Sequence, residues 1–246
     1  MSLWLNFCVN TNNIKSRILF QNEACLILNK IKGEAAQGVG KEGIVNLPKK
    51  LAVELGKKEI IQAAHRIDVP VTGCVLFALT KESLVFLNSA FAGKGIIKIE
   101  KLYWAIVEKP SLPPPDFQPS GELIHWIETN SRHNKSFVYD EEAPGRKKAV
   151  LKYRVIGEGK NYLFVEAELL SGRHHQIRAQ LAAIGMKIKG DVKYGARRAE
   201  KEGGIRLHAR SLVFPNPLNP NEKIQVIADP PEIDNLWSEF LLIRGP

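Results

Sequence analysis

The sequence predicts an α+β fold in which a largely antiparallel mixed β-sheet is flanked by helices and loops. Strand-like apolar patterns outnumber helical ones, and many follow one another without a helical crossover. Apolar residues make up 44% of the 246, which is enough for a packed core in one large domain. We expect a short N-terminal extension over residues 1–16 and a single domain over residues 17–246.

Each predicted element follows from the spacing of apolar residues and from the glycines and prolines that interrupt regular structure. Apolar residues recur at helical spacing in residues 81–91 and 177–184, and residues 46–55 favour a short helix. Glycines between Gly33 and Gly43 predict a mobile loop, while five prolines in residues 110–119 predict an extended one. Strands are expected at residues 18–20, 24–30, 75–79, 96–107, 121–127, 150–156, 162–170 and 206–214.

The charge of the chain points to an anionic partner. Its 35 Lys and Arg residues against 26 acids give a net charge of +9. Residues 173–210 contain ten Lys and Arg residues and three acids, a pattern typical of proteins that bind nucleic acid or anionic lipid. A generic solvated surface would give the same count, so charge alone does not decide between these interpretations.

The chain carries no sign of export, membrane insertion or a disulfide framework. No apolar run approaches the roughly 20 residues of a membrane helix, and the N-terminus lacks the basic region of a signal peptide. We therefore expect a cytoplasmic protein with no membrane partner. The three cysteines, Cys8, Cys25 and Cys74, are widely spaced, and the last two are expected to be buried thiols.

Asp68 is the first candidate for chemistry, because it follows His65 and Arg66 on a tight loop before an apolar strand. A carboxylate in that position can serve as a nucleophile or a general base if a cation keeps it ionised. Arg66 alternates with Asp68 in an extended chain, and Arg178 is a second cation that could reach it. The alternative is a structural aspartate that caps the turn.

A second candidate cluster runs from Gly172 to Arg178 and includes Arg173, His174 and Gln176. If a helix begins there, His174 and Arg178 share one face of it, and the cluster can position phosphate, ribose or base edges. A solvent-facing helix start is the alternative. A zinc site is not expected, because adjacent His174 and His175 diverge on a helix and no further ligand stands at the required spacing.

Two further groups can extend a nucleic-acid site. Tyr103 shares a strand face with Lys101 and can stack on a nucleobase, unless it is a core tyrosine. Lys193 and Arg210 would extend a phosphate-binding face. His208 is expected to be a satisfied core histidine.

The order of these motifs resembles that of the RluA-type pseudouridine synthase family, over about residues 17–228. Ile67 for Leu, Thr72 for Ser and His174 for Thr are departures from the family pattern. We expect a stand-alone catalytic domain without the small S4-like domain that many relatives carry at the N-terminus. The matching segments are Leu26-Ile27-Leu28-Asn29-Lys30, His65-Arg66-Ile67-Asp68, Val71-Thr72-Gly73, Lys101-Leu102-Tyr103, Gly172-Arg173-His174-His175-Gln176-Ile177-Arg178, Gly190-Asp191-Val192-Lys193-Tyr194-Gly195 and Leu207-His208-Ala209.

The resemblance implies that residues 17–246 are a catalytic domain that isomerises uridine to pseudouridine in ribosomal or transfer RNA, bound in a cleft across the sheet. The target base is flipped out of its stack. The family implies Asp68, Tyr103 and Arg178 as catalytic residues, without cofactor or metal, in a protein expected to be a monomer. The residues expected to contact RNA are His65, Arg66, Arg173, His174, Gln176, Lys193 and Leu207.

Two other classes remain open at this point. A non-catalytic RNA-binding protein on the same fold would keep the basic residues and tolerate loss of Asp68. An enzyme acting on small phosphorylated substrates would turn over nucleotides with weak salt dependence, whereas RNA binding weakens steeply as salt increases.

Overall fold

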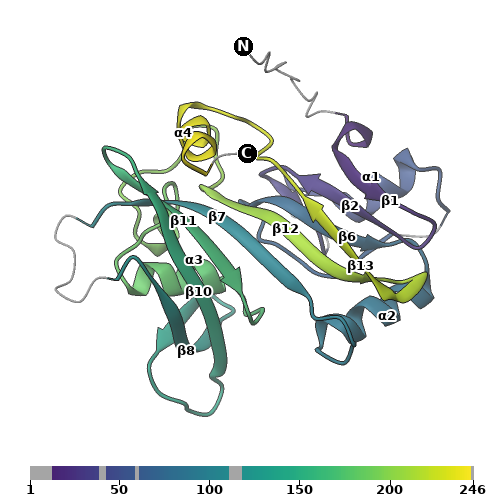
Figure 1. Cartoon of the computed structure of the whole chain (residues 1–246), viewed down its shortest axis with the longest axis horizontal. Helices are drawn as coiled ribbons and strands as arrows, with labels where there is room; N and C mark the ends of the chain where they lie inside the picture. Colours follow the sequence, from purple (N-terminus) through teal and green to yellow (C-terminus); the bar gives the residue numbers. More distant parts are fainter. Residues whose placement is uncertain (1–12, 39–42, 59–60, 111–117, 245–246) are drawn as a thin grey trace.

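Eleven strands in the described part of the chain join into one mixed sheet (Figure 1). The computed structural model describes residues 13–38, 43–58, 61–110 and 118–244. The strands of this sheet are β1 (Ile18–Gln21), β2 (Cys25–Lys30), β5 (Gln62–Ala63), β6 (Thr72–Ala78), β7 (Glu100–Glu108), β8 (Ser120–Asn130), β9 (Lys135–Tyr139), β10 (Lys147–Glu158), β11 (Tyr162–Leu169), β12 (Leu207–Asn216) and β13 (Asn219–Ile227).

The strand order is β1-β2-β6-β12-β7-β11-β10-β8-β9, with β5 beside β6 and β13 beside β12. Within the described sheet, β6 and β12 form the one parallel pair, and the other pairs are antiparallel. Gly73 allows β6 to approach β12, because a Cβ at this position would lie 2.3 Å from the Ala209 carbonyl oxygen. The close approach places the loop before β6 against the centre of the sheet.

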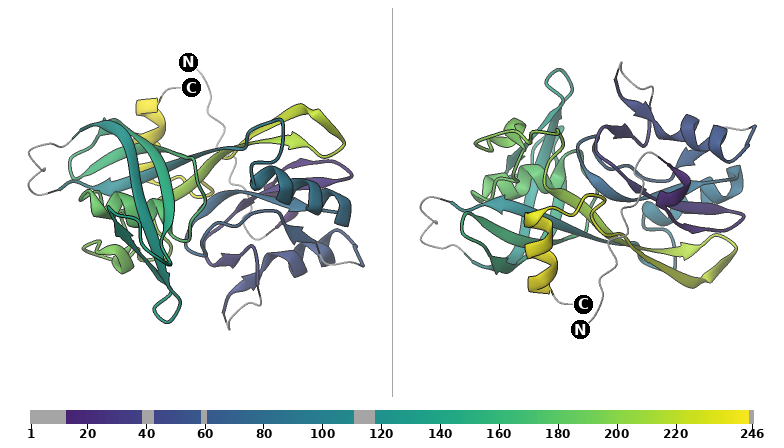
Figure 2. Two further views of the ribbon diagram at one scale, coloured as in Figure 1. Left: turned by 90° about the horizontal axis from the view of Figure 1, so that it is seen from below. Right: turned by 90° about the horizontal axis from the view of Figure 1, so that it is seen from above.

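Helices cover both faces of the sheet (Figure 2). α1 (Leu47–Glu54) and α3 (Gln176–Ala183) contribute Leu51 and Leu181 to a core cluster on one face. α2 (Lys81–Phe91) and α4 (Asn235–Arg244) pack on the other face, the first against β2, β6 and β12 and the second against β7 and β11. Because neighbouring strand residues point to opposite faces, Tyr103 lies on the α3 side and Trp104 on the α4 side.

The α+β class and the largely antiparallel sheet predicted from sequence are confirmed. α2 matches its predicted bounds, and α1 and α3 match to within about a residue. Thr80 explains the sharp start of α2, because it forms a capping box with Ser83. Both described cysteines, Cys25 and Cys74, are buried as predicted, and burial raises the pKa of each thiol to about 12.

Three longer elements, β9, β13 and α4, were not predicted from the sequence, and neither were the two-residue strands, β5 among them. The prolines that begin at Pro215 were expected to end the last strand. β12 nevertheless continues through Pro215, because the hydrogen-bond ladder between β12 and β7 already ends at Val213, and β13 follows as the next strand. The glycine-rich segment is flanked by a short parallel pair, β3 (Glu34–Ala35) and β4 (Val45–Asn46), and residues 39–42 lie outside the described residues.

The predicted extension lies mostly outside the described residues, as does Cys8. Ile14 is already buried in the core, next to the 3₁₀ turn η1 (Lys15–Arg17). The boundary at residue 17 therefore remains a proposal. In the described ranges, no helix has the length and apolar character needed to cross a membrane.

Candidate active site

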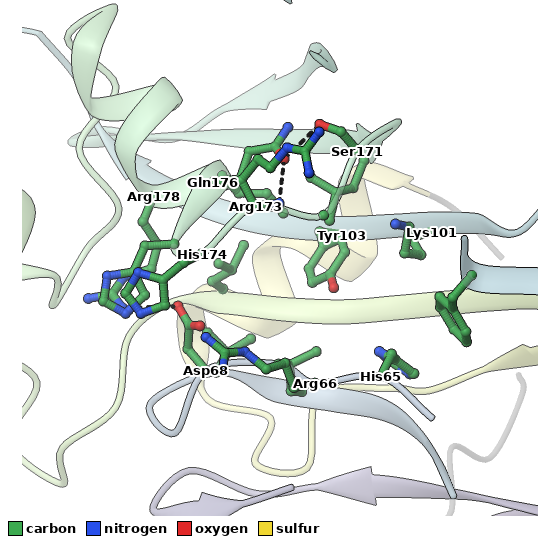
Figure 3. A pocket seen from close by; sticks show the side chains of 18 of the residues that line it. His65, Arg66, Asp68, Lys101, Tyr103, Ser171, Arg173, His174, Gln176 and Arg178 are labelled. Carbon is green, nitrogen blue, oxygen red and sulfur yellow. Dashed lines mark hydrogen bonds and ion pairs between the residues drawn. The ribbon is translucent and has the colours of Figure 1, made fainter. Parts of the chain in front are cut away.

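A cavity of about 460 Å³ opens on the α3 face of the sheet (Figure 3). Its walls come from the loop before β6, from β7 and β12, and from the loop between β11 and α3. Nine of the ten residues predicted from sequence line it: His65, Arg66, Asp68, Tyr103, Arg173, His174, Gln176, Arg178 and Leu207. The tenth, Lys193, lines an adjoining hollow of about 290 Å³ that also contains Asp68.

Asp68 lies on a turn closed by a 3.0 Å hydrogen bond from the Val71 N–H group to its carbonyl oxygen. Its side chain is 19% exposed, and its Oδ2 accepts a 3.0 Å hydrogen bond from Arg178 Nη1. The contact that the sequence suggested between these two residues is therefore present. Among the described residues lining the cavity, Asp68 is the one carboxylate.

Arg178 is held by a second carboxylate that sequence reasoning did not place in the site. Its Nε and Nη2 donate to Oδ2 and Oδ1 of Asp191 at 2.6 and 2.8 Å, which leaves Nη1 for Asp68. Burial alone would lower the pKa of Arg178, but the hydrogen bonds and charges of Asp191 and Asp68 raise it above its ordinary value. The guanidinium is thus a fixed charge, oriented by one aspartate toward the other.

Tyr103 points into the cavity from β7 and is 6% exposed (Figure 3). Burial and the charge of Asp68 raise its pKa well above the ordinary value, so its hydroxyl stays neutral. Lys101 lines the cavity from the same strand face, as the alternation of residues predicts. An aromatic face and a cation therefore stand side by side on β7.

His65 forms part of the cavity wall, and its ring is held by the protein. Its Nε2 accepts a 3.1 Å hydrogen bond from the Leu76 N–H group, and the ring stacks on Phe91 with centroids 5.0 Å apart. Burial and nearby Lys101 lower its pKa to about 3. By contrast, Arg66 is exposed at the mouth of the cavity.

The loop between β11 and α3 is shaped by Gln176. Its Oε1 accepts hydrogen bonds from Ser171 Oγ at 2.8 Å and from the Arg173 N–H group at 3.0 Å, and its Nε2 donates to Val150 O at 3.0 Å. The amide is therefore occupied by protein groups. Arg173 itself remains exposed, with Nε bonded to Lys148 O at 2.9 Å.

The start of α3 differs from the sequence expectation. The helix begins at Gln176, and His175 before it has a left-handed backbone with φ of 52°. His174 therefore lies outside the helix and does not share a helical face with Arg178. The rings of His174 and His175 stack 3.8 Å apart instead of diverging, so the reason given above against a metal site was wrong. In the described residues, no three potential ligands cluster around a metal position.

The last candidate residues divide between the two faces of the sheet. Lys193 donates to the Asn134 carbonyl oxygen at 3.0 Å. Arg210 lies over Trp104 at 4.1 Å and pairs with Asp229, on the α4 face, so the expectation that it extends the phosphate face was wrong. Leu207 is buried in the cavity wall. His208 is a satisfied core histidine as expected, bonded to Thr72 Oγ1 at 2.8 Å and Ala228 O at 2.9 Å.

Comparison with known proteins gives one consistent class. A family model described as RNA pseudouridylate synthase matches residues 24–183. An uncharacterised RNA pseudouridine synthase of Zymomonas mobilis is 29% identical over 81% of this chain and 87% of its own. Ribosomal large subunit pseudouridine synthase D of the same organism is 27% identical over 95% of this chain and 75% of its own. An uncharacterised RNA pseudouridine synthase of Mycoplasma genitalium is longer, and this chain covers 65% of it.

Solved structures show the same fold. Human RNA pseudouridylate synthase domain containing 4 superposes with a TM-score of 0.71 at 22% identity, over 98% of this chain and 97% of the other. Fold and family model together define an isomerase that modifies RNA. The chain belongs to the RNA pseudouridylate synthase family and is an RNA pseudouridine synthase, and the resemblance found in its sequence motifs is confirmed.

Proposed function

We propose that this enzyme isomerises specific uridines in structured ribosomal or transfer RNA, with Asp68 as its catalytic carboxylate. The observation that carries the proposal is the environment of Asp68. It is the one carboxylate among the described residues lining the cavity, and the charged guanidinium of Arg178 donates a hydrogen bond to its Oδ2. Residues 17–246 would form the catalytic domain.

The reaction moves the ribose C1′ atom from N1 to C5 of the same uracil. The bond between C1′ and N1 breaks, the uracil turns, a bond forms between C1′ and C5, the C5 proton leaves, and N1 takes up a proton, so the product is an isomer of the substrate. Asp68 would attack the ribose or the base, or abstract a ribose proton, and each route needs an ionised carboxylate beside the base. Retaining glycosidases use two carboxylates for a related cleavage, but here the uracil is both leaving group and acceptor.

The other cavity residues fit the handling of a flipped base. Extrusion from an RNA stack costs a few kcal/mol, which stacking in the enzyme offsets. Tyr103 offers its ring and a neutral hydroxyl near the base, where it would assist loss of the C5 proton. Exposed Arg66 would occupy the vacated place in the stack. His65, Gln176 and Leu207 would shape the pocket for the base.

Cations around the mouth support binding of the RNA backbone. Arg66 and Arg173 are exposed there, and Lys101 lines the cavity beside them. Lys193 extends this surface into the adjoining hollow, which His174 also lines; burial lowers the pKa of His174, so its ring is a polar contact and not one of the cations. Phosphate contacts of this kind position the RNA without reading its sequence. Ribosomal RNA is the first substrate to test, because relatives are named as ribosomal large subunit enzymes.

The test is to incubate the protein with unmodified RNA from its host and map new pseudouridines by chemical labelling, with Asp68→Ala as the control. New sites made by the unmutated protein alone would support the proposal and identify the substrate. RNA bound tightly in a salt-dependent manner, with no new site in any ribosomal or transfer RNA, would instead favour the non-catalytic interpretation.

A further inference from the structure

The two oxygens of the Asp68 carboxylate have different surroundings. Oδ2 receives the 3.0 Å hydrogen bond from Arg178 and lies 3.6 Å from His175 Nε2. In the described ranges, no side-chain hydrogen bond or ion pair reaches Oδ1. Two nitrogen atoms therefore face one oxygen and leave the other to the cavity.

His175 reaches Asp68 because of its unusual backbone. The left-handed conformation at the start of α3 is uncommon for residues other than glycine, although histidine adopts it more often than most, and it persists where surrounding contacts hold it. The side chain is 6% exposed and packed between the stacked ring of His174 and the ring edge of Tyr194, at centroid distances of 3.8 and 5.7 Å. The ring is thus fixed in orientation, with Nε2 toward Asp68.

A chain of hydrogen bonds favours one of the two neutral tautomers of His175. The backbone N–H of Ser136 donates to Tyr194 Oη at 2.8 Å. The Tyr194 hydroxyl hydrogen is then available for His175 Nδ1, 3.0 Å away. With Nδ1 as the acceptor, a neutral imidazole carries its hydrogen on Nε2, which is the atom that faces Asp68.

We propose that His175 is a positioning residue for the reaction, held as the Nε2–H tautomer by Tyr194, and that with Arg178 it confines Asp68 Oδ2 so that Oδ1 is the reacting oxygen. The inference rests on the proposed function of Asp68. The 3.6 Å separation exceeds a hydrogen bond, and a shift of roughly 0.5 Å on RNA binding would close it.

The charge state of the ring agrees with this role. Burial, and then the charges of Arg178, His174, Lys193 and Arg66, lower the pKa of His175 to about 2. The imidazole is therefore neutral under ordinary conditions. A neutral N–H donor can steady the carboxylate without sharing its proton, which keeps Asp68 available for the substrate.

Two substitutions at position 175 distinguish the effect of the imidazole N–H group from the effect of the left-handed backbone. Asparagine tolerates the left-handed conformation but is too short to reach Asp68. Glutamine can place an N–H₂ group near the position of Nε2. We expect His175→Asn to lower the single-turnover rate on saturating RNA by about 10²-fold, with RNA affinity within about twofold, and His175→Gln to recover roughly tenfold of that loss.

Tyr194→Phe and Ser136→Ala form the matched pair that tests the hydrogen-bond chain. The first removes the donor to His175. The second keeps the backbone N–H that orients Tyr194 and removes only the hydroxyl, which contacts His174. We expect Tyr194→Phe to slow the reaction about tenfold and Ser136→Ala to change it by less than about threefold. Equal losses in the two variants would overturn the proposal.

Nitrogen NMR of the imidazole measures which ring nitrogen carries the hydrogen. If His175 had only a structural role, Tyr194→Phe would not change this tautomer. One histidine, identified by its absence in His175→Asn, should carry its hydrogen on Nε2, and this tautomer should lose its dominance in Tyr194→Phe. Hydrogen on Nδ1 in the unmutated protein would contradict the inference. Normal turnover in His175→Asn would reject it while leaving the proposed function intact, whereas absence of turnover in the unmutated protein would reject the proposed function itself.

Discussion

Two clusters of ion pairs draw on the same basic segment of the sequence but lie on opposite faces of the sheet. The Asp68 cluster consists of Asp68, His175, Arg178 and Asp191. The Arg206 cluster consists of Lys189, Glu200, Arg206 and Asp234, at the start of α4. Both are partly or wholly buried, and both place arginine between two carboxylates.

The carboxylates distinguish the two clusters. Glu200 binds Lys189 through Oε1 and Arg206 through Oε2, at 3.1 Å for the latter. Asp234 accepts from Arg206 at Oδ2 and from the Trp237 N–H group at Oδ1, at 2.5 and 3.1 Å. Burial raises the pKa of both acids, but the hydrogen bonds and charges around them, from Arg206 and Lys189 at Glu200 and from Arg206 and backbone N–H groups at Asp234, together outweigh it and lower both values.

In the Asp68 cluster, both carboxylate oxygens of Asp191 likewise accept hydrogen bonds. At Asp68, Oδ2 accepts one from Arg178, and no described side chain reaches Oδ1. The comparison teaches that a buried ion pair becomes a candidate catalytic group when one of its oxygens is left facing a cavity. Counting charges along the sequence cannot make that distinction, because the same segment supplies both clusters. Half of the ten Lys and Arg residues in the basic segment 173–210 form ion pairs in the structure: Arg178, Lys189, Arg197, Arg206 and Arg210.

Replacing the arginine of the Asp68 cluster should have the largest effect. Arg178→Ala leaves Asp191 buried without its partner and Asp68 without its cation. We expect single-turnover rates to fall about 10²-fold or more, and the free energy of unfolding to fall by about 3 kcal/mol. Kinetics on saturating RNA and urea unfolding measure the two effects. Exposed Arg173→Ala is the control, and should weaken RNA binding more than it slows the reaction. Equal loss of rate and affinity in Arg178→Ala would make it mainly a phosphate contact.

The arginine of the Arg206 cluster should affect stability alone. Arg206→Met removes the cation shared by Glu200 and Asp234, whose side chains are 15% and 45% exposed. We expect a loss of about 2 kcal/mol in the free energy of unfolding, with turnover per folded molecule unchanged. Urea unfolding and single-turnover kinetics on one preparation decide this. A slowed reaction in fully folded Arg206→Met would remove the distinction between the clusters.

Lys30 gives a smaller effect that depends on pH. Its Nζ is buried and donates to Ile31 O and Val69 O at 2.9 and 3.0 Å, so it supports the residue after Asp68. Burial lowers its pKa to about 7 despite nearby Glu34 and Asp68. Above that pH and below about 10.5, the unfolded chain binds one more proton than the folded chain.

The free energy of unfolding should therefore rise with pH from about 7 by up to about 1.4 kcal/mol per unit, relative to Lys30→Met, and lose this increment as pH falls back to 7. Unfolding curves between pH 6 and roughly 9 measure the slope. Lys32→Met is the matched control, since Lys32 pairs with exposed Glu232 at 2.8 Å and should contribute less than about 1 kcal/mol at any pH. Parallel curves for the unmutated protein and Lys30→Met would show that Lys30 is not buried as a weak base.

Much of this arrangement could be predicted from the sequence, because its signals are local. Periodicity located α2 and the strands around the site, and the motif order placed Asp68, Tyr103 and Arg178 together. Alternation along β12 could also have placed Arg210 correctly, since Leu207 and Ala209 face the core on the α3 side.

The remainder depends on contacts between distant parts of the chain. The bidentate bond of Asp191 to Arg178, the Ser136 contact to Tyr194 and the left-handed turn at His175 form only when β9, α3 and the loop after it are assembled. The spacing of residues in the sequence cannot indicate which carboxylate oxygen of Asp68 accepts the hydrogen bond from Arg178. β13 and α4 were missed because prolines and a weakly periodic C-terminal segment mask them.

The most direct test of the account is the single-turnover rate of Asp68→Asn on a defined RNA substrate, measured beside its RNA affinity. The amide keeps the shape of the side chain but cannot act as a carboxylate. We predict a rate lowered by at least roughly 10⁴-fold with affinity nearly unchanged, because phosphate contacts supply most of the binding. Pseudouridine formed by Asp68→Asn at a rate near that of the unmutated protein would contradict the account.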